Sequence, residues 1–450
     1  MYPVRSLRLW RPVAAGIVLL LVGCTRATTH SAESRTPDEP ILARVSTQTL
    51  TPASGASGLA KFFYDLQRLQ AGQLDHVRIL QLGDSHTAGD VFSGYLRSRF
   101  HQRFGNSGRG MMPPGYTYRG LRQTEVKITQ SRGWVIHDSL KASDPGPFGI
   151  SGFVATSTNA GARMAVSPMD PDGFDIARVN YLHSTSGGSL EVLLDGRIAK
   201  VVSTAGPADT PGSLDLPNPA GTQTLEIIAD APGIRITSWG IERRQPGILF
   251  DSFGVSGATI DIFNHWDPLL VQWDLKQLRP SLIIVAYGTN EAFKSDFDAT
   301  TYKQVFAQVL KSLRRMAPEA SILVVGPPGG ERNSSRQKGS ESTGSTGRWE
   351  TPESVTEVRY IQHDTAIAFG DAFWDWASVV GGSRGFNHWV YADPPLVRSD
   401  HIHFTVLGYE TSAKALFNFL MDGYTTAEGQ THAKIADETQ PSSNSSEVTH

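Results

Sequence analysis

Ser85 is the residue of this sequence best placed to act as a nucleophile. It ends the run Gly83–Asp84–Ser85, which comes directly after the apolar or strand-compatible segment 79–82. Apolar side chains then recur at helical spacing, which predicts a helix after the serine. A serine on the turn between a buried strand and a helix is accessible, and it lies near N–H groups that can stabilise an anion. The three residues also suit an ordinary turn or helix cap, so the rest of the chain must decide.

A serine hydroxyl needs a base within hydrogen-bond reach and a third group that orients that base. Asp400 and His403 lie three residues apart, just before a predicted helix over 408–421. At this spacing a carboxylate can contact the imidazole and fix its tautomer, while the other ring nitrogen faces a serine. The pair therefore provides a candidate general base, His403, and its partner, Asp400. In isolation the pair is more typical of a capping aspartate and a structural histidine.

Acyl transfer also needs hydrogen-bond donors that face the developing oxyanion. Asn290 follows the apolar segment 281–288, and its side chain can project over the carboxyl edge of a sheet. Gly257 follows the segment 247–254 and offers a backbone N–H. Taken alone, Asn290 also suits an Asx turn and Gly257 a plain turn.

The elements that must position these residues follow an alternating pattern. Apolar runs end near Leu82, Gly288 and Gly326, and they alternate with amphipathic helices predicted over 59–69, 302–316, 355–369 and 408–421. Such alternation predicts a three-layer α/β/α core around a parallel sheet. Between the first two core strands, residues 121–246 show short alternating runs and a hairpin turn at 194–197. This stretch predicts an inserted all-β sandwich.

The N-terminus predicts export. Basic residues at 5, 8 and 11 precede an apolar run over 13–22 that ends at Gly23 and Cys24. This is the form of a secretory signal, and the ending resembles the lipobox of bacterial lipoproteins, in which the cysteine carries the lipid. Cys24 is the only cysteine of the 450 residues, so no disulfide can form within the chain. The alternative is a plain secretory signal with an incidental cysteine.

These patterns divide the chain into six parts. We expect a lipoprotein signal peptide (1–23), a flexible tether (24–57), the first part of the core (58–120), the β insert (121–246), the second part of the core (247–424) and a disordered tail (425–450). The formal net charge of −3 becomes more negative when the basic signal is removed. A mildly acidic chain without a clustered basic face does not indicate nucleic-acid binding.

Four blocks occur together and in a fixed order, over residues 79–90, 250–260, 283–291 and 400–409. In that order they resemble the four motifs of the SGNH (GDSL) hydrolase superfamily. The resemblance implies that Ser85 is the nucleophile, with His403 as base and Asp400 as its partner. It also implies an oxyanion hole made by the N–H groups of Ser85 and Gly257 and the side chain of Asn290, with no metal and no cofactor. The third block has Glu291 where many relatives have aspartate.

The β insert and the run 83–90, Gly-Asp-Ser-His-Thr-Ala-Gly-Asp, are similar to those of peptidoglycan O-acetylesterases of Gram-negative bacteria. That likeness implies removal of the 6-O-acetyl group of N-acetylmuramic acid through an acetyl-serine intermediate. The lipobox-like ending at Cys24 predicts a periplasmic enzyme that a lipid holds to the membrane, at the outer membrane, and an enzyme located there could reach this substrate. Two alternatives use the same serine and histidine: an O-acetyltransferase, and an esterase for another polysaccharide or a lipid. A third, of another class, is a non-catalytic lipoprotein that binds the cell wall.

Other chemically suggestive residues have simpler interpretations. His401 and His403 form no metal site by themselves, because no carboxylate cluster accompanies them. Trp374 and Trp376, in a strand-like run, are expected to pack in the core. His86 has no assigned role, and Arg109, in a glycine-rich turn, is expected to be solvated.

Overall fold

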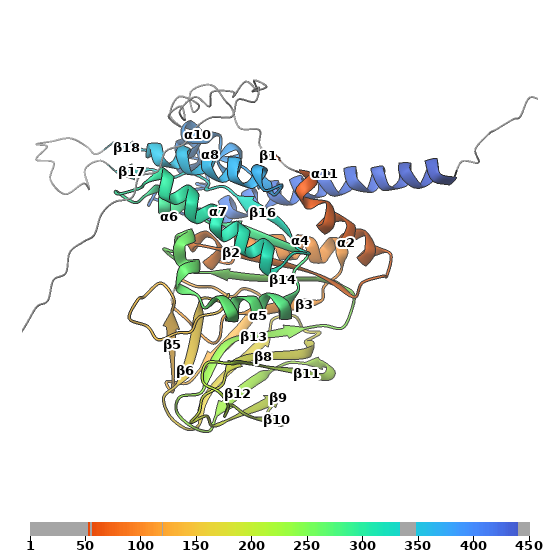
Figure 1. Cartoon of the computed structure of the whole chain (residues 1–450), viewed down its shortest axis with the longest axis vertical. Helices are drawn as coiled ribbons and strands as arrows, with labels where there is room; N and C mark the ends of the chain where they lie inside the picture. The colour runs from red at the N-terminus through yellow and green to blue at the C-terminus, as the bar shows by residue number, and fades with distance from the viewer. Residues whose placement is uncertain (1–52, 55, 119, 334–347, 440–450) are drawn as a thin grey trace, which may run out of the picture.

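The computed structural model describes residues 53–54, 56–118, 120–333 and 348–439 (Figure 1). The expected signal peptide, Cys24 and most of the tether lie outside the described residues. In the part that is described, no helix is both long and apolar enough to cross a membrane.

A six-stranded sheet forms the centre of the core, in the order β1-β19-β16-β15-β2-β14. The five strands from β19 to β14 run parallel to one another, and β1 pairs antiparallel with β19. The strands are β1 (Ala53–Ser54), β2 (His76–Gly83), β14 (Gly247–Gly254), β15 (Leu282–Ala286), β16 (Ser321–Val325) and β19 (Ala372–Trp374). Every residue of β14, β15, β16 and β19 is buried, as expected for a parallel sheet covered on both faces.

Helices cover both faces of this sheet. On one face, α2 (Ala60–Gln70), α4 (Phe92–Phe104) and α11 (Val406–Thr439) share one apolar cluster with the sheet. On the other, α5 (Pro268–Leu278), α7 (Ala299–Met316) and α8 (Glu353–Ala368) share a second one. The predicted three-layer α/β arrangement is therefore confirmed. The shorter helices are η1 (Ala56–Leu59), α3 (Ser85–Ala88), η2 (Ile260–His265), α6 (Thr289–Ala292), α9 (Trp376–Val380) and α10 (Gly382–Val390).

Two antiparallel sheets come between β2 and β14 in the chain and lie below the core in Figure 1. One has the order β10-β9-β12-β7-β4, and the other has the order β11-β8-β13-β6-β5, with β3 also paired to β13. Their facing side chains form a third apolar cluster that includes Trp239, Ile236 and Val166. The strands are β3 (Gly108–Met112), β4 (Val126–Gln130), β5 (Trp134–Asp138), β6 (Phe153–Ser157), β7 (Ala162–Pro168), β8 (Phe174–Leu182), β9 (Ser189–Leu194), β10 (Arg197–Ser203), β11 (Pro211–Thr222), β12 (Leu225–Ala229) and β13 (Arg235–Glu242).

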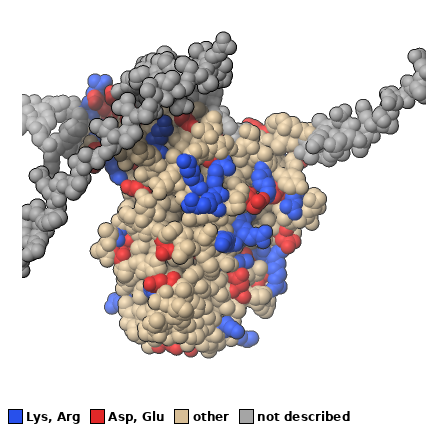
Figure 2. All heavy atoms as spheres, in the orientation of Figure 1, with Lys and Arg blue, Asp and Glu red and all other residues tan. Residues whose placement is uncertain are grey.

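A buried ion-pair cluster joins this β unit to the parallel sheet. Arg78 of β2 contacts Asp251 of β14 at 2.8 Å and Glu242 of β13 at 2.6 Å. All three side chains are almost fully buried, so removing one would leave an unpaired buried charge. At the surface, acidic and basic side chains are interspersed on the face shown in Figure 2. Exposed pairs of this kind contribute little to stability.

Several predicted boundaries were wrong. The glycine-rich run that was expected to be a turn contains β3, which pairs with β13 in the antiparallel sheet, so strands of the β unit begin before residue 121. Helix α11 continues to Thr439, well past residue 425, where a disordered tail was expected. Residues 372–380 are not one strand-like run, because β19 ends at Trp374 and α9 begins at Trp376.

Besides β3, five strands of the β unit were not predicted: β5, β6, β7, β10 and β11. Three of them, β5, β10 and β11, are edge strands, which need not alternate cleanly between buried and exposed residues. Strand β10 is exposed at nearly every position, and β11 contains prolines that only an edge tolerates. The hairpin at 194–197 was predicted correctly, and Asp195 and Gly196 both have positive φ there, as a type I′ turn requires.

Candidate active site

The ends of three neighbouring strands meet at one edge of the parallel sheet. The strands β14, β2 and β15 lie side by side, and their last residues are in register with Gly83 of β2. Ser85 follows the middle strand, Gly257 follows β14 and Asn290 follows β15. Parallel strands collect the residues that follow them at a single edge, where open α/β sheets bind ligands. The three separate sequence blocks are therefore brought together by the topology.

Ser85 begins the short helix α3 on a tight turn. Asp84 caps that turn, since its carboxylate accepts a hydrogen bond from the N–H of His86 at 2.9 Å. Ser85 is partly exposed, whereas its neighbours on both sides are buried. The backbone N–H of Ser85 donates to no acceptor in the described part of the chain, so it is available to a ligand.

His403 reaches Ser85 from the loop before α11. The imidazole Nε2 lies 2.9 Å from Ser85 Oγ, and Nδ1 lies 2.9 Å from Asp400 Oδ2. The structure thus places the three residues in the linear contact that a nucleophile, a base and an orienting acid require. With its proton on Nδ1, held by the carboxylate, His403 presents a lone pair on Nε2 to the hydroxyl.

The Asp400 carboxylate is itself held in place. Its Oδ1 accepts the backbone N–H groups of Ile402 and His403, both at 2.9 Å, which leaves Oδ2 for the imidazole. Partial burial acts to raise the pKa of Asp400, but the hydrogen bonds from His403 and Ile402 outweigh it and hold this pKa well below its usual range. Asp400 therefore remains a carboxylate throughout the range in which a histidine base operates.

Gly257 occupies the third position of a tight turn. The N–H of Ala258 donates to the carbonyl of Val255 at 3.1 Å, and Gly257 has φ +85°. These are the features of a type II turn, which needs glycine at this position because L-residues rarely adopt that φ. The N–H of Gly257 has no acceptor among the described residues. It can therefore serve as an oxyanion donor.

Asn290 is oriented by the same turn. Its Nδ2 donates to the carbonyl of Ala258 at 2.9 Å and approaches Asp84 Oδ2 at 3.4 Å. One N–H of the amide is thus used to fix the side chain, and the other has only a long contact. Burial raises the pKa of Asp84 to about 7, and the hydrogen bond from His86 and the charge of His403 oppose that rise.

A cluster of packed aromatic rings lies beside His403, and it was not predicted from the sequence. His86 lies with its ring centroid 5.5 Å from that of His403, and its Nδ1 lies 2.9 Å from the hydroxyl of Tyr409. Burial, helped by the neighbouring His403, lowers the pKa of His86 to about 3, so the ring stays neutral. Trp376 packs against His86 and stacks on Phe404, which confirms that it is a core residue. The adjacency of His86 to Ser85 was the only signal in the sequence.

His401 points away from the serine. Its Nδ1 lies 2.6 Å from Glu331 Oε2, and its ring stacks on Trp349 with centroids 3.6 Å apart. Glu331 and Trp349 had not been singled out in the sequence, because nothing in their local pattern links them to residue 401. No three His, Cys, Asp or Glu side chains in the described ranges form a group that could hold a metal ion.

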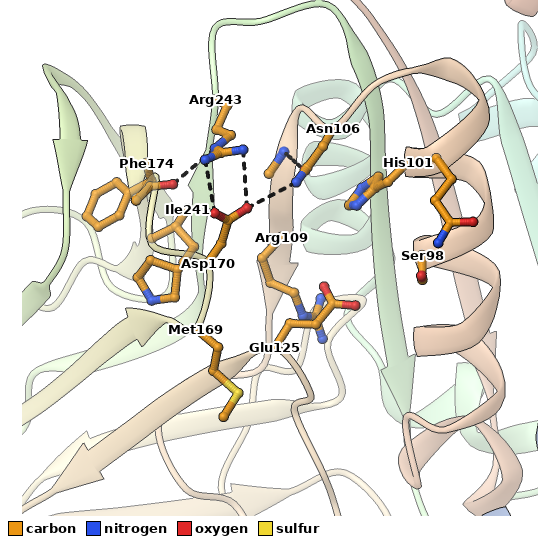
Figure 3. A pocket seen from close by; sticks show the side chains of 14 residues that line it. Ser98, His101, Asn106, Arg109, Glu125, Met169, Asp170, Phe174, Ile241 and Arg243 are labelled. Carbon is orange, nitrogen blue, oxygen red and sulfur yellow. Dashed lines mark hydrogen bonds and ion pairs between the residues drawn. The ribbon is translucent and has the colours of Figure 1, made fainter.

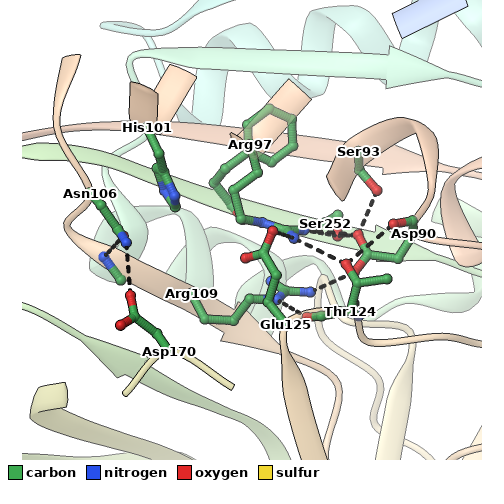
Figure 4. A network of polar contacts seen from close by, with 12 residues as sticks. Asp90, Ser93, Arg97, His101, Asn106, Arg109, Thr124, Glu125, Asp170 and Ser252 are labelled. Carbon is green, nitrogen blue, oxygen red and sulfur yellow. Dashed lines mark hydrogen bonds and ion pairs between the residues drawn. The ribbon is translucent and has the colours of Figure 1, made fainter. Parts of the chain in front are cut away.

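Arg109 is buried, contrary to expectation. It is only 5% exposed and donates to Asp90 Oδ2 at 3.0 Å. Figure 4 shows Asp90 at the centre of this network, with Arg97 and Thr124 also directed at its carboxylate. Burial acts to raise the pKa of Asp90, but Arg97 and Arg109 hold it well below its usual range. Arg109 is thus part of the buried polar network between the core and the β unit.

A cavity of about 480 Å³ lies beside Arg109, between α4 and the β unit (Figure 3). Arg243 and Asn106 both bind Asp170 across it. None of Ser85, Asp400 and His403 lines this cavity, so it is separate from the contact described above.

Comparison with known proteins agrees with this geometry. Residues 237–411 match the model of the GDSL-like Lipase/Acylhydrolase family, a range that contains Gly257, Asn290, Asp400 and His403 but not Ser85. A solved structure of a peptidoglycan O-acetylesterase is 26% identical, with a TM-score of 0.71, and the match covers 84% of this chain and 100% of that one. No curated protein matches the sequence.

Two other solved structures are much less similar. One is a family two carbohydrate esterase from Clostridium thermocellum, 12% identical over 64% of this chain and 98% of that chain, with a TM-score of 0.30. The other is a salicylyl-acyltransferase from a tetracycline biosynthetic pathway, 13% identical over 65% of this chain and 96% of that chain, with a TM-score of 0.27. The family match, the extensive structural match and the contact of Ser85 with His403 together identify the chain as a carboxylic ester hydrolase that is similar to the SGNH (GDSL) enzymes.

Proposed function

We propose that this protein is a serine acetylesterase that removes O-acetyl groups from peptidoglycan, at the 6-hydroxyl of N-acetylmuramic acid. The observation that carries the proposal is the structural match to a peptidoglycan O-acetylesterase, which spans 84% of this chain and therefore includes much more than the family motifs. The contact of Ser85 with His403 supplies the nucleophile and base that the reaction needs.

In the proposed acylation step, Ser85 Oγ attacks the acetyl carbonyl while His403 Nε2 takes the hydroxyl proton. Negative charge develops on the carbonyl oxygen and is stabilised by the N–H groups of Ser85 and Gly257 and by Asn290 Nδ2. His403 then returns the proton to the departing sugar oxygen, which leaves an acetyl-serine. A water, deprotonated by the same histidine, hydrolyses the ester and releases acetate.

The β unit is the proposed glycan-binding part. Its location supports this role, because Leu140 of the β5–β6 connection lies beside Gly257. A Cβ placed on Gly257 would be 3.5 Å from Leu140 Cδ2. A glycan strand that delivers its acetyl group to Ser85 would then lie against the β unit as well as the core.

We further propose that the protein is periplasmic and anchored through a lipid on Cys24, at the outer membrane. The basic and apolar residues before Cys24 support this location. Replacing Cys24 with serine is expected to release the protein from the membrane fraction into the soluble fraction. Retention of Cys24→Ser in the membrane would contradict a lipid anchor at that residue.

The central test is acetate release from O-acetylated peptidoglycan and from a small aryl acetate, for the wild-type protein and Ser85→Ala. Base-treated peptidoglycan, which has lost its ester groups, is the substrate control. Activity on both substrates that disappears in Ser85→Ala is the expected result. Hydrolysis of the aryl ester alone would keep the serine mechanism and overturn the substrate. Acetate transfer to a glycan acceptor, without release, would indicate a transferase.

A further inference from the structure

The segment that connects strands β3 and β4 of the β unit is bound to the nucleophile turn. This connecting segment, residues 113–125 without residue 119, lies between β3 and β4. Near its end, the N–H of Arg122 donates to the carbonyl of Ala88 at 2.8 Å, and the N–H of Thr124 donates to Asp90 Oδ2 at 2.8 Å. Both acceptors follow Ser85 within five residues of the chain, and Figure 4 shows Thr124 beside Asp90. The connecting segment therefore has a fixed position relative to the nucleophile.

Tyr118, in the middle of the connecting segment, contacts the oxyanion turn. Its hydroxyl accepts the backbone N–H of Ser256 at 2.9 Å. The ring packs against Phe153 of β6, with centroids 6.0 Å apart, so the β unit supports the phenol from behind. Burial raises the pKa of Tyr118, which keeps the group a neutral phenol.

The bond to Ser256 matters because Ser256 and Gly257 are the two central residues of the type II turn. The direction of the Gly257 N–H is set by the orientation of the peptide group between them. Three contacts hold the turn: Val255 N–H donates to Gly83, Asn290 donates to Ala258, and Ser256 N–H donates to Tyr118. Among the described residues, Tyr118 is the acceptor for Ser256 N–H, and it is the one of these three partners that comes from outside the core strand ends.

We propose that Tyr118 is a positioning residue for the oxyanion hole, acting through Ser256 to aim the N–H of Gly257. The inference rests on the proposed function, because it assumes that an oxyanion forms beside Gly257. It adds that the connecting segment sets two parts of the site at once. Arg122 and Thr124 fix the segment to the nucleophile turn, and Tyr118 fixes it to the oxyanion turn.

The test compares Tyr118→Phe with Tyr116→Phe as a matched control. Phenylalanine at 118 keeps the ring that packs on Phe153 and removes only the hydroxyl. Tyr116 lies two residues earlier and is 60% exposed, and its hydroxyl makes no hydrogen bond in the described structure. Four quantities are measured in both variants: kcat and KM for an aryl acetate, the rate of phosphorylation of Ser85 by a dialkyl nitrophenyl phosphate, and the thermal midpoint of unfolding.

The phosphorylation reports on the oxyanion hole directly. Ser85 Oγ forms a bond to phosphorus, nitrophenolate leaves, the hydroxyl proton passes to His403, and charge develops on the phosphoryl oxygen. We expect Tyr118→Phe to lower kcat and the phosphorylation rate by the same factor, about three- to tenfold, the worth of one hydrogen bond. KM should stay within about twofold, as for an interaction made in the transition state. Tyr116→Phe should match the wild type in every quantity.

Each other outcome overturns the inference in a distinguishable way. Equal rates in the two variants, or a lower melting temperature without a change in rate, would reduce Tyr118 to a structural residue. A fall in kcat without a matching fall in phosphorylation would place its effect in another step. If the wild-type protein reacts with neither reagent, the proposed function fails, and this inference fails with it.

Discussion

Asp400→Asn should damage catalysis more than Asp400→Ala, although asparagine is the closer match in shape. In the wild type, Oδ1 accepts two backbone N–H groups and Oδ2 faces His403 Nδ1. An asparagine will keep its carbonyl oxygen on the two N–H donors, because its amide nitrogen cannot accept from them. The amide then donates to Nδ1. This places the imidazole proton on Nε2, where it blocks proton transfer from Ser85.

The magnitude follows from these contacts. Turning the asparagine amide over would break two hydrogen bonds of about 0.5–1.5 kcal/mol each, so the useful orientation is populated at roughly one part in ten to one in a hundred. Loss of the carboxylate charge that stabilises the imidazolium adds to this, giving a total fall of roughly 10³–10⁴-fold in kcat. In Asp400→Ala, water can accept the Nδ1 proton, because the Asp400 side chain is 47% exposed. We expect that variant to lose only about 10²-fold, since it keeps the useful tautomer.

The assay is steady-state hydrolysis of an aryl acetate by wild type, Asp400→Asn, Asp400→Ala and Ser85→Ala, between pH 6 and 9. Ser85→Ala gives the background and should be the least active of the four. Both Asp400 variants must melt within a few degrees of the wild type for the comparison to hold. The reasoning is refuted if Asp400→Asn is as active as Asp400→Ala, or if either keeps more than about a tenth of the wild-type kcat.

Two further predictions concern buried carboxyl groups. Burial raises the pKa of Glu291 to about 8, above its unfolded value, so its contribution to stability is full at acidic pH and is lost as the pH rises toward 8. Glu291→Gln can still accept a hydrogen bond from Ile260 N–H. Its free energy of unfolding should therefore exceed that of the wild type by a margin that grows from pH 5 to 8.5, by up to about 1.4 kcal/mol per pH unit. If thermal unfolding over this pH series gives parallel curves for the two proteins, the prediction is contradicted. Asp90→Ala leaves Arg97 and Arg109 buried without their shared partner. It should lower the free energy of unfolding, measured with a denaturant, by about 3–5 kcal/mol. A loss under 1 kcal/mol would show that the structure around the two arginines relaxes.

The residues that contact one another at the site could be predicted because each follows a strongly patterned element. Segments 79–82 and 281–288 are almost wholly apolar, which predicts buried parallel strands, and parallel strands bring the residues after them to one edge. The spacing of Asp400 and His403 allows their side chains to meet, and the four blocks taken together selected this pair as the base and its partner. The sequence thus contained both the strand ends and the local pair, and the structure adds their contact at 2.9 Å.

The contacts around the site could not be predicted, since they depend on which loops pack against which. His86 meets Tyr409 across more than 300 positions of the chain, and no periodicity links the two. The contacts of Glu331 and Trp349 with His401 could not be predicted for the same reason. The edge strands β10 and β11 were missed because an edge strand need not alternate between apolar and polar residues and can contain proline. Strand β10 is exposed at nearly every position, and β11 contains prolines.

The point of insertion explains why the β unit affects the site at all. The strands β2 and β14 are adjacent in the sheet, and Ser85 and Gly257 follow them directly. The chain returns to the sheet at Gly247, which pairs with His76 at the end of β2 opposite to Ser85. The segment between β3 and β4 is the part of the insertion that contacts the turns beside the reacting atoms. Tyr118 on the outgoing segment binds the oxyanion turn, and Leu140 of the β unit lies beside Gly257. An insertion after β16 would follow a strand that is three positions from β14 and could not contact both turns in this way. The β unit can thus influence which esters reach Ser85 without contributing a residue to the reaction itself.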